Sequence, residues 1–309
     1  MYDFSVIMPT HNRSDYLREA VRSILAQQVC LELIIVDDAS TDDTPAVVQE
    51  MIRENEQENI AVVYLRNDKS LFANGSRQRG YLAARGKYII FMDDDDFYVD
   101  NCFFADAKGV LDTHAQVNSV LGATVGFCDG QYEAPMDLCG NGIIPNREYV
   151  NNFVAKYSKP QSTLTAVFRK EALDAVNLAD CEMINDTCIY LWGTLNGDVY
   201  LINRPVAAYR FHSSNISNSK FAYDFIMGTL NEKLKVYEYA QQAQKLNDRK
   251  AWLNRHLGMS VCYFLRTNRR DMKSVCGIIS WFMIHGHGVQ LDVCKKIIRE
   301  YFIKSRVGY

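Results

Sequence analysis

The sequence predicts an α/β protein in which a doubly wound, mostly parallel sheet is followed by a helical C-terminal extension. Short apolar runs typical of buried parallel strands alternate with helix signals over the first hundred residues. The charge then reverses near residue 220. Residues 1–219 hold 18 Lys and Arg against 30 Asp and Glu, whereas residues 220–309 hold 16 against 7. We therefore expect an α/β domain over 1–219 and a basic helical region over 220–309.

The expected elements follow one another closely in the first part of the chain. The expected strands lie at 4–8, 33–36, 60–65 and 87–92, and Pro9 ends the first of them. The first helix runs to about 28 with Asn12 or Ser14 as N-cap, and the second runs to about 55 with Thr44 as N-cap and Pro45 as first residue. The third helix follows a turn at Asn74-Gly75 and ends at Ala84. Each strand is separated from the next by a helix, which favours right-handed crossovers and a parallel sheet.

The rest of the chain changes from strands to helices. Strands are expected at 117–127 and 199–210 with irregular chain over 129–162, and helices at about 222–246, 249–266, 271–284 and 289–306. The longest apolar run, 275–284, is too short to cross a membrane, and the N-terminus does not resemble a signal peptide. The nine scattered cysteines contain no CxxC pair, and no metal is assigned to the isolated His285 and His287. We expect a cytoplasmic protein with reduced thiols.

Polar clusters follow three of the expected strands, at residues 10–13, 37–40 and 93–96. Ligands of such sheets lie off the carboxyl ends of the strands, so these clusters are the candidate site. The cluster at 93–96 consists of four aspartates. A run of like charges is often a solvated turn, but adjacent carboxylates at a strand end repel one another unless a cation neutralises them. Carboxylate oxygens suit Mg²⁺ or Mn²⁺.

Four segments resemble the inverting nucleotide-sugar glycosyltransferases of family 2, which have the GT-A fold. They are SVIMPTHNR at 5–13, IVDDASTD at 35–42, NGSRQRG at 74–80 and YIIFMDDDD at 88–96. The order and the spacing of the four segments resemble those of the family, as do the residues themselves. The resemblance covers about 1–100 strongly and 160–217 more loosely, and it does not reach the C-terminal region. It implies a GT-A-type sheet and the transfer of a sugar from a UDP-sugar, with inversion, to a hydroxyl of a saccharide or a lipid-linked saccharide.

The resemblance also implies roles for single residues. The donor-binding positions fall on Pro9, Thr10, His11, Arg13, Asp38, Arg77, Asp93 and Asp94. Pro9 and Asp38 match the contacts to uracil, Arg77 lies near the base or diphosphate, and Asp93 lies near the ribose. Asp95 matches the ligand of a Mn²⁺ or Mg²⁺ ion that bridges the two phosphates.

Two later segments complete the resemblance. Asp186 in INDTCIYLW, at 184–192, takes the position of the catalytic base. His212 matches a histidine that often approaches the metal or diphosphate, although an ordinary surface or core histidine explains it equally well. The sequence departs from the family at His11, Gln78 and Asn185, where an aromatic residue, an asparagine and a glutamate are usual.

Two other classes of function compete with this interpretation. A nucleotidyltransferase also combines a metal, carboxylates and an α/β sheet, but it should carry a glycine-rich phosphate loop, and residues 8–16 contain no glycine. The second alternative is a non-catalytic nucleotide-binding or interaction module. Three interpretations of the basic region over 220–309 stay open at this point. It is a solvated surface, a contact with another subunit, or an attachment to the anionic inner face of the cell membrane. No nucleic-acid partner is expected, and the sequence predicts no oligomeric state.

Overall fold

The computed structural model describes residues 2–55, 57–212, 223–267 and 272–299. The chain divides into two compact units, Met1–Phe211 and His212–Tyr309, which we call unit 1 and unit 2. Each is described by itself.

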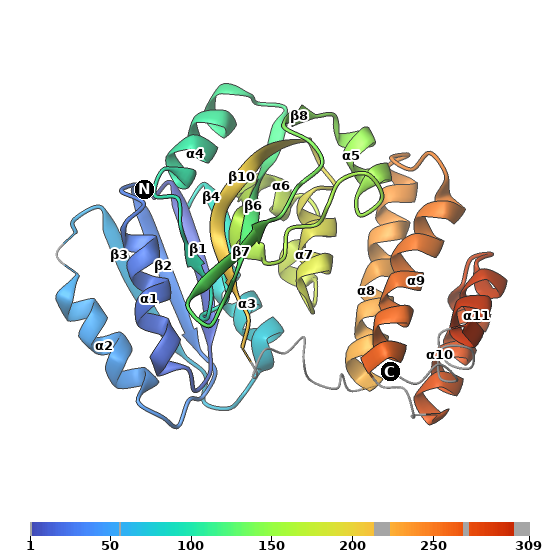
Figure 1. The fold of residues 1–309 in the computed structure, drawn as a ribbon, viewed down its shortest axis with the longest axis horizontal. Coiled ribbons are helices and arrows are strands. Elements are labelled where there is room, and N and C mark those ends of the chain that lie inside the picture. Colours follow the sequence, from blue (N-terminus) through green and yellow to red (C-terminus); the bar gives the residue numbers. More distant parts are fainter. Residues whose placement is uncertain (1, 56, 213–222, 268–271, 300–309) are drawn as a thin grey trace. The chain divides into compact units, whose positions relative to one another are not determined.

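Unit 1 is built on a ten-stranded sheet that begins with the expected parallel strands (Figure 1). The strand order is β3 (Ile60–Arg66), β2 (Leu31–Asp37), β1 (Phe4–Thr10), β4 (Tyr88–Phe91), β9 (Ala166–Arg169), β6 (Val117–Cys128), β10 (Asp198–Arg210) and β5 (Phe97–Tyr98). Neighbours among β3, β2, β1 and β4 are parallel, as are β6 and β10. Two short strands, β7 (Gln131–Pro135) and β8 (Gly142–Ile144), pair with β6 and β10. The doubly wound, mostly parallel sheet is confirmed.

The expectation of irregular chain over 129–162 was wrong, because β7, β8 and a short helix at Asn146–Asn152 lie there. Strands β5 and β9 were not predicted either. Strand β9 matters most for the sheet. It lies between β4 and β6 and is antiparallel to both, so it joins the two parallel halves of the sheet. Its four residues are all buried, but four residues are too few to show a periodicity.

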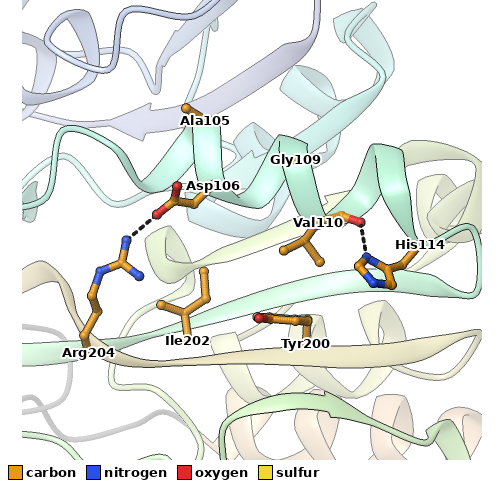
Figure 2. Close-up of a pocket in the computed structure, with 8 residues that line it drawn as sticks. All are labelled: Ala105, Asp106, Gly109, Val110, His114, Tyr200, Ile202 and Arg204. Atoms are coloured by element: carbon orange, nitrogen blue, oxygen red, sulfur yellow. Dashed lines mark hydrogen bonds and ion pairs between the residues drawn. The ribbon is translucent and has the colours of Figure 1, made fainter.

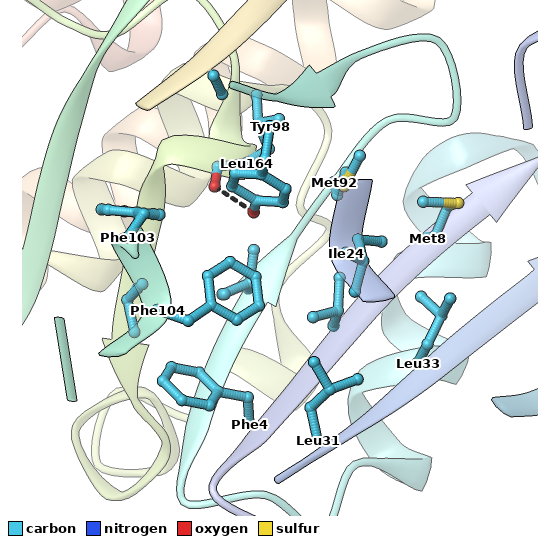
Figure 3. Packing of buried hydrophobic residues seen from close by; sticks show 14 of the residues in the cluster. Phe4, Met8, Ile24, Leu31, Leu33, Met92, Tyr98, Phe103, Phe104 and Leu164 are labelled. Atoms are coloured by element: carbon cyan, nitrogen blue, oxygen red, sulfur yellow. Dashed lines mark hydrogen bonds between the residues drawn. The ribbon is translucent and has the colours of Figure 1, made fainter. Parts of the chain in front are cut away.

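Helices cover both faces of the sheet. They are α1 (Ser14–Leu25), α2 (Thr44–Glu54), α3 (Phe72–Ala83), α4 (Phe103–Thr113), α5 (Asn146–Asn152), α6 (Lys170–Asp174) and α7 (Asp186–Gly193), with 3₁₀ turns η1 (Thr163–Thr165) and η2 (Leu178–Asp180). Figure 3 shows the core on one face, where Phe4 and Leu31 of the sheet lie beside Ile24 of α1 and Phe104 of α4. Because side chains alternate along a strand, Ile7 of β1 points to the other face, toward α3.

Several expected element boundaries were wrong. Strand β1 continues through Pro9, which pairs with Val36 of β2. The backbone N–H and C=O groups of residues 7 and 9 point toward β4, but the pairing of β1 with β4 ends at Ile7. Pro9, which has no N–H, therefore removes no hydrogen bond between these strands. The N-caps of α1 and α2 are Arg13 and Asp43, one residue from the caps expected at Asn12 or Ser14 and at Thr44. Asn74-Gly75 lies inside α3 and not in a turn.

The described part of unit 2 is helical, as expected. It contains α8 (Tyr223–Gln242), α9 (Arg249–Thr267), α10 (Met272–His285) and α11 (Gln290–Ile298). The helix expected over 289–306 falls partly outside the described residues. Helix α9 packs against α8 and α11 through buried residues that include Trp252, which stacks on Tyr237. Among the helices described, none is both long and apolar enough to span a bilayer.

Candidate active site

The ends of strands β1, β4 and β10 meet at the four aspartates. Thr10, the last residue of β1, donates its hydroxyl hydrogen bond to Asp94 Oδ2 at 2.6 Å. The backbone N–H of Arg210, the last residue of β10, donates to Asp96 Oδ1 at 2.9 Å. Arg210 Nε also donates to the backbone oxygen of Asp95 at 2.8 Å. The topology therefore holds the aspartate loop from both halves of the sheet.

Two arginines pair with this cluster of carboxylates. Arg13 forms an ion pair with Asp95, and its Nη1 lies 3.7 Å from Asp94 Oδ1. Arg77, buried in α3, donates to Asp93 Oδ1 at 2.8 Å. Arg13 and Arg77 thus neutralise part of the negative charge.

The carboxylates carry more negative charge than these arginines compensate. Burial and the charge of Asp95 raise the pKa of Asp94 to about 7, against the opposing effects of Arg13 and Thr10. Burial, together with Asp95 and Asp93, raises the pKa of Asp96 well above its usual range. A divalent cation would relieve this repulsion, and hard carboxylate oxygens suit Mg²⁺ or Mn²⁺. The donor set therefore fits such an ion.

The expected metal ligands are Asp95 and His212. His212 follows β10 by two residues and is the first residue of unit 2, and its assignment stays a prediction. Within the described ranges, no three His, Cys, Asp or Glu side chains gather as a ligand set. Mg²⁺ is commonly held by one or two carboxylates with phosphate oxygens completing its shell, so a larger protein ligand set is unnecessary.

Asp38, directly after β2, organises the loop between β3 and α3. Its Oδ1 accepts hydrogen bonds from Asn67 Nδ2 and Leu71 N, both at 2.7 Å, and from Ser76 Oγ at 3.2 Å. Its Oδ2 accepts from Ser70 Oγ at 2.5 Å. Burial would raise the pKa of Asp38, but these hydrogen bonds outweigh it and lower the pKa. The carboxylate stays ionised, and Oδ2 keeps capacity for another donor.

His11 lies beside Asp38, and its Nδ1 is within hydrogen-bond distance, 2.7 Å, of the backbone oxygen of Asp38. Pro9 is buried in β1. The expected donor-binding residues of the first two polar clusters therefore come together at the carboxyl edge of the sheet.

Asp186 lies close to the aspartate cluster although it is ninety residues away in sequence. It is the first residue of α7, and its Oδ1 lies 3.9 Å from Arg77 Nη2, the group that also binds Asp93. Burial and the charge of Asp93 raise the pKa of Asp186, while Lys159 and Arg77 act in the opposite direction. One arginine thus connects the end of β4 with the start of α7.

Two of the departures from the family pattern have structural roles here. Asn185 is the N-cap of α7, and its side chain accepts from Cys188 N at 3.1 Å. Gln78 Nε2 donates to the backbone oxygen of Ala179 at 2.6 Å, which ties α3 to η2 just ahead of α7. Both residues therefore support the position of Asp186.

Sequence reasoning missed Lys159 and Arg210. Lys159 lies near enough to Asp186 and Asp93 for their charges to raise its pKa, although burial dominates and lowers it. No motif marks Lys159, which belongs to the irregular stretch between 129 and 162. Arg210 ends a strand, so the rule that drew attention to the aspartates would also have found it.

A hollow of about 390 Å³ lies elsewhere on unit 1, between α4 and β10 (Figure 2). Val110, Ile202 and Tyr200 form its apolar part, and the ion pair of Arg204 with Asp106 lies at one end. It shares no lining residue with the aspartate cluster, so it is separate from the candidate active site.

Similarity to known proteins agrees with this arrangement. The chain is 28% identical over 273 residues to the GalNAc(5)-diNAcBac-PP-undecaprenol beta-1,3-glucosyltransferase of Campylobacter jejuni, a match that covers 85% of this chain and 83% of that protein. It is also 28% identical over 219 residues to the putative teichuronic acid biosynthesis glycosyltransferase TuaG of Bacillus subtilis, which covers 70% and 82%.

A solved structure extends the similarity to the fold. The crystal structure of S. aureus TarS 1–349 in complex with UDP-GlcNAc superposes with a TM-score of 0.62 at 16% identity, covering 97% of this chain and 82% of that one. The family model described as "Glycosyl transferase family 2" matches residues 5–176, more than half of the chain. This decides against the nucleotidyltransferase alternative. The chain belongs to glycosyl transferase family 2, and it is a glycosyltransferase with the GT-A fold.

Proposed function

We propose that this enzyme transfers a sugar from a UDP-sugar to a hydroxyl of a lipid-linked saccharide, with inversion and with the help of Mn²⁺ or Mg²⁺. Two relatives support the acceptor class: the Campylobacter jejuni protein is named for a PP-undecaprenol acceptor and WfgD of Escherichia coli for a diphosphoundecaprenol acceptor. TarS in complex with UDP-GlcNAc, and in another structure with UDP, supports the donor class.

The observation that carries the proposal is the position of Arg77 between Asp93 and Asp186. The guanidinium lies 2.8 Å from one carboxylate and 3.9 Å from the other. A direct displacement needs a cationic surrounding for the leaving diphosphate and a base on the opposite side of the anomeric carbon. One guanidinium nitrogen thus lies within 4.0 Å of a carboxylate of the aspartate cluster and of a carboxylate at the start of α7, which supports a site shared by both.

The donor is assigned to the carboxyl edge of the sheet. Asp38 Oδ2 and the neighbouring Pro9 and His11 would bind the uracil, with the carboxylate accepting from the ring N–H. Asp93 would bind the ribose, and Thr10 would hold Asp94 in place through the bond at 2.6 Å.

The diphosphate is assigned to the positive charges around the aspartates. Arg13 and Arg77 would lie near it, and Asp95, with His212, would hold the divalent ion. That ion would stabilise the negative charge that develops on the leaving diphosphate.

Asp186 is the proposed general base. One of its carboxylate oxygens takes the proton of the acceptor hydroxyl while the hydroxyl oxygen forms a bond to the anomeric carbon. The bond from that carbon to the diphosphate oxygen breaks, and UDP leaves with the electron pair. A single displacement inverts the anomeric centre and needs no covalent enzyme intermediate.

The exchange Asp186→Asn tests the proposal. Asparagine keeps the shape of the side chain but cannot take a proton, so transfer should fall by about 10²-fold or more while the dissociation constant for UDP stays unchanged. Sugar transfer and UDP release are measured with Mn²⁺ present, and Asp180→Asn, an exposed aspartate of η2, is the matched control. Transfer by Asp186→Asn at the rate of the Asp180→Asn control would show that the base lies elsewhere.

A further inference from the structure

Arg13 combines a fixed backbone with a side chain that reaches the aspartate cluster. It is the N-cap of α1, where its N–H donates to Thr44 Oγ1 at 3.3 Å. Its carbonyl oxygen accepts from the N–H groups of Tyr16 and Leu17 at 3.2 and 3.3 Å. The guanidinium is carried on a flexible stem of methylene groups, so it can change partners while the backbone stays in place.

The guanidinium of Arg13 binds the carboxylate that we assign to the divalent ion. Its Nη1 forms a hydrogen-bonded ion pair with Asp95 Oδ2 and lies 3.7 Å from Asp94 Oδ1. The side chains of Arg13 and Asp95 are only 19% and 14% exposed, so salt screens their attraction less than that of a surface pair. A ligand that binds Asp95 therefore meets a cation that is already held there.

Arg13 and a divalent ion at Asp95 would oppose each other. A metal ligand offers the lone pairs of its carboxylate to the ion, and the ion pair with Arg13 uses lone pairs of the same carboxylate. Two further positive charges would also lie close to the guanidinium. Because arginine stays protonated, Arg13 cannot avoid this repulsion by losing its charge. Arg13 therefore has to withdraw from Asp95, or it weakens the binding of the ion.

The donor diphosphate is the group best suited to take over Arg13. Asp94 is a poor substitute, because its Oδ1 lies 3.7 Å from Nη1 and its Oδ2 accepts from Thr10 at 2.6 Å. Phosphate oxygens match the planar guanidinium and form charge-assisted hydrogen bonds with it. Arg77 differs from Arg13, since it is buried and lies between carboxylates of two elements. Of these two arginines, Arg13 is the one placed for an exchange of partners.

We propose that Arg13 exchanges Asp95 for the donor diphosphate when a divalent ion binds, and that this exchange couples the binding of metal and donor. The inference rests on the proposed function, from which it takes both ligands. Either ligand alone has to break the ion pair between Arg13 and Asp95, and the second ligand then finds it already broken. Metal and nucleotide should therefore strengthen each other's binding by the same factor.

The variant Arg13→Met separates this exchange from other sources of coupling. An ion that bridges the phosphates would couple the two ligands through direct contact, whether or not Arg13 takes part. Methionine keeps an unbranched side chain without the charge, so it leaves that contact in place and removes the exchange. The matched control is Arg18→Met in the same helix, because Arg18 pairs with Glu50 and not with the aspartate cluster.

Binding measurements on the full chain test the proposal without acceptor and without turnover. The probes are Mn²⁺ alone, UDP alone, and each in the presence of the other. Electron paramagnetic resonance of free Mn²⁺ gives the dissociation constant of the metal, and titration calorimetry gives that of UDP. The coupling factor is the ratio of the Mn²⁺ dissociation constants without and with UDP. Thermal unfolding establishes that each variant is folded.

We expect Arg13→Met to bind Mn²⁺ alone about tenfold more tightly than wild type, and its coupling factor to be about tenfold smaller. Arg18→Met should behave like wild type in both respects.

The two expectations can fail separately. Mn²⁺ binding by Arg13→Met no tighter than by wild type would overturn the competition for Asp95. Tighter Mn²⁺ binding with an unchanged coupling factor would overturn the exchange, because Arg13 would then act only through its charge. In both cases wild type still binds Mn²⁺ and UDP, and the proposed function stands. Wild type that binds neither ligand would contradict the proposed function and this inference together.

Discussion

At the scale of single residues, the candidate site combines several carboxylates with a smaller number of cationic side chains, which neutralise part of the negative charge. Arg77 joins Asp93 to Asp186, and Arg13 binds Asp95. The aspartates could be predicted because they directly follow an apolar strand, and Asp186 because of its motif. Lys159 could not be predicted, because the chain that carries it has no regular pattern. Its closeness to Asp186 exists only in the folded protein.

Removing the proposed metal ligand should separate metal binding from folding. In Asp95→Ala, we expect metal-dependent binding of UDP to be lost, because one of few carboxylates available to the ion is gone. Titration calorimetry with UDP, with and without Mn²⁺, measures the effect, and wild type without Mn²⁺ is the reference. An Asp95→Ala protein that binds UDP with Mn²⁺ as tightly as wild type would refute the assignment.

Lys159 should set the pH at which Asp186 works as a base. Burial already raises the pKa of Asp186, and Lys159 opposes that rise. The base is active when ionised, so kcat/KM should fall as pH decreases through this pKa. In Lys159→Met, the pKa of Asp186 rises further, and the acidic limb of the profile should move to higher pH.

The control for Lys159 is Lys156→Met, three residues earlier. Lys156 is exposed and pairs with Glu148 at 2.7 Å, away from the carboxylates of the site. Its removal should leave the acidic limb where it is in wild type. An acidic limb at the same pH in both variants would mean that Lys159 does not act on Asp186.

At the scale of elements, long apolar strands were predictable and short ones were not. Strands β1 and β2 have seven residues each and are mostly apolar, whereas β5 and β9 have two and four residues. The burial of a short strand depends on its neighbours in the fold, and its few residues form no recognisable pattern in the sequence. Likewise, Asn74-Gly75 has the letters of a turn but lies in α3, because packing of α3 on the sheet overrides local preference.

Two helix glycines should respond oppositely to alanine. An added Cβ at Gly80 of α3 would lie 2.4 Å from Ile7 Cγ2 in β1, so Gly80→Ala should destabilise unit 1 by about 1–3 kcal/mol. At Gly109 of α4, no atom lies within 4 Å of an added Cβ, and alanine should stabilise by about 0.5–1 kcal/mol. Urea unfolding measures both. A stability change of the same sign in both variants would contradict the packing argument.

At the scale of the whole molecule, the net charge of −3 conceals a strong asymmetry. Residues 1–219 carry an excess of acids and residues 220–309 an excess of bases, as the counts of 30 against 18 and 7 against 16 indicate. The change of charge lies close to the division between the two units at residues 211 and 212. The division expected from the sequence at residues 219 and 220 stays a prediction.

This asymmetry should appear in ion-exchange behaviour. At pH 7, above the sequence pI of about 6.1, a uniformly charged protein would not bind a cation exchanger. We expect this protein to be retained at low ionic strength and released by salt, because a local basic surface suffices for binding. Lys273→Glu/Lys295→Glu should elute at lower salt. Passage of the wild-type protein through the column unretained would contradict the expectation.

The placement of β9 and β10 also affects how the protein emerges from the ribosome. Strand β6 ends at residue 128, but its sheet neighbours β9 and β10 begin at 166 and 198. At about 5–20 residues per second, β10 begins to appear roughly 4–14 s after β6 is complete. Strand β9 begins to appear about 2–8 s after β6 is complete, and before that only the end of β6 can pair, with β7 in a local hairpin. The nascent chain therefore carries an apolar strand with open edges for seconds, and this interval of synthesis is the one in which a chaperone would protect it most.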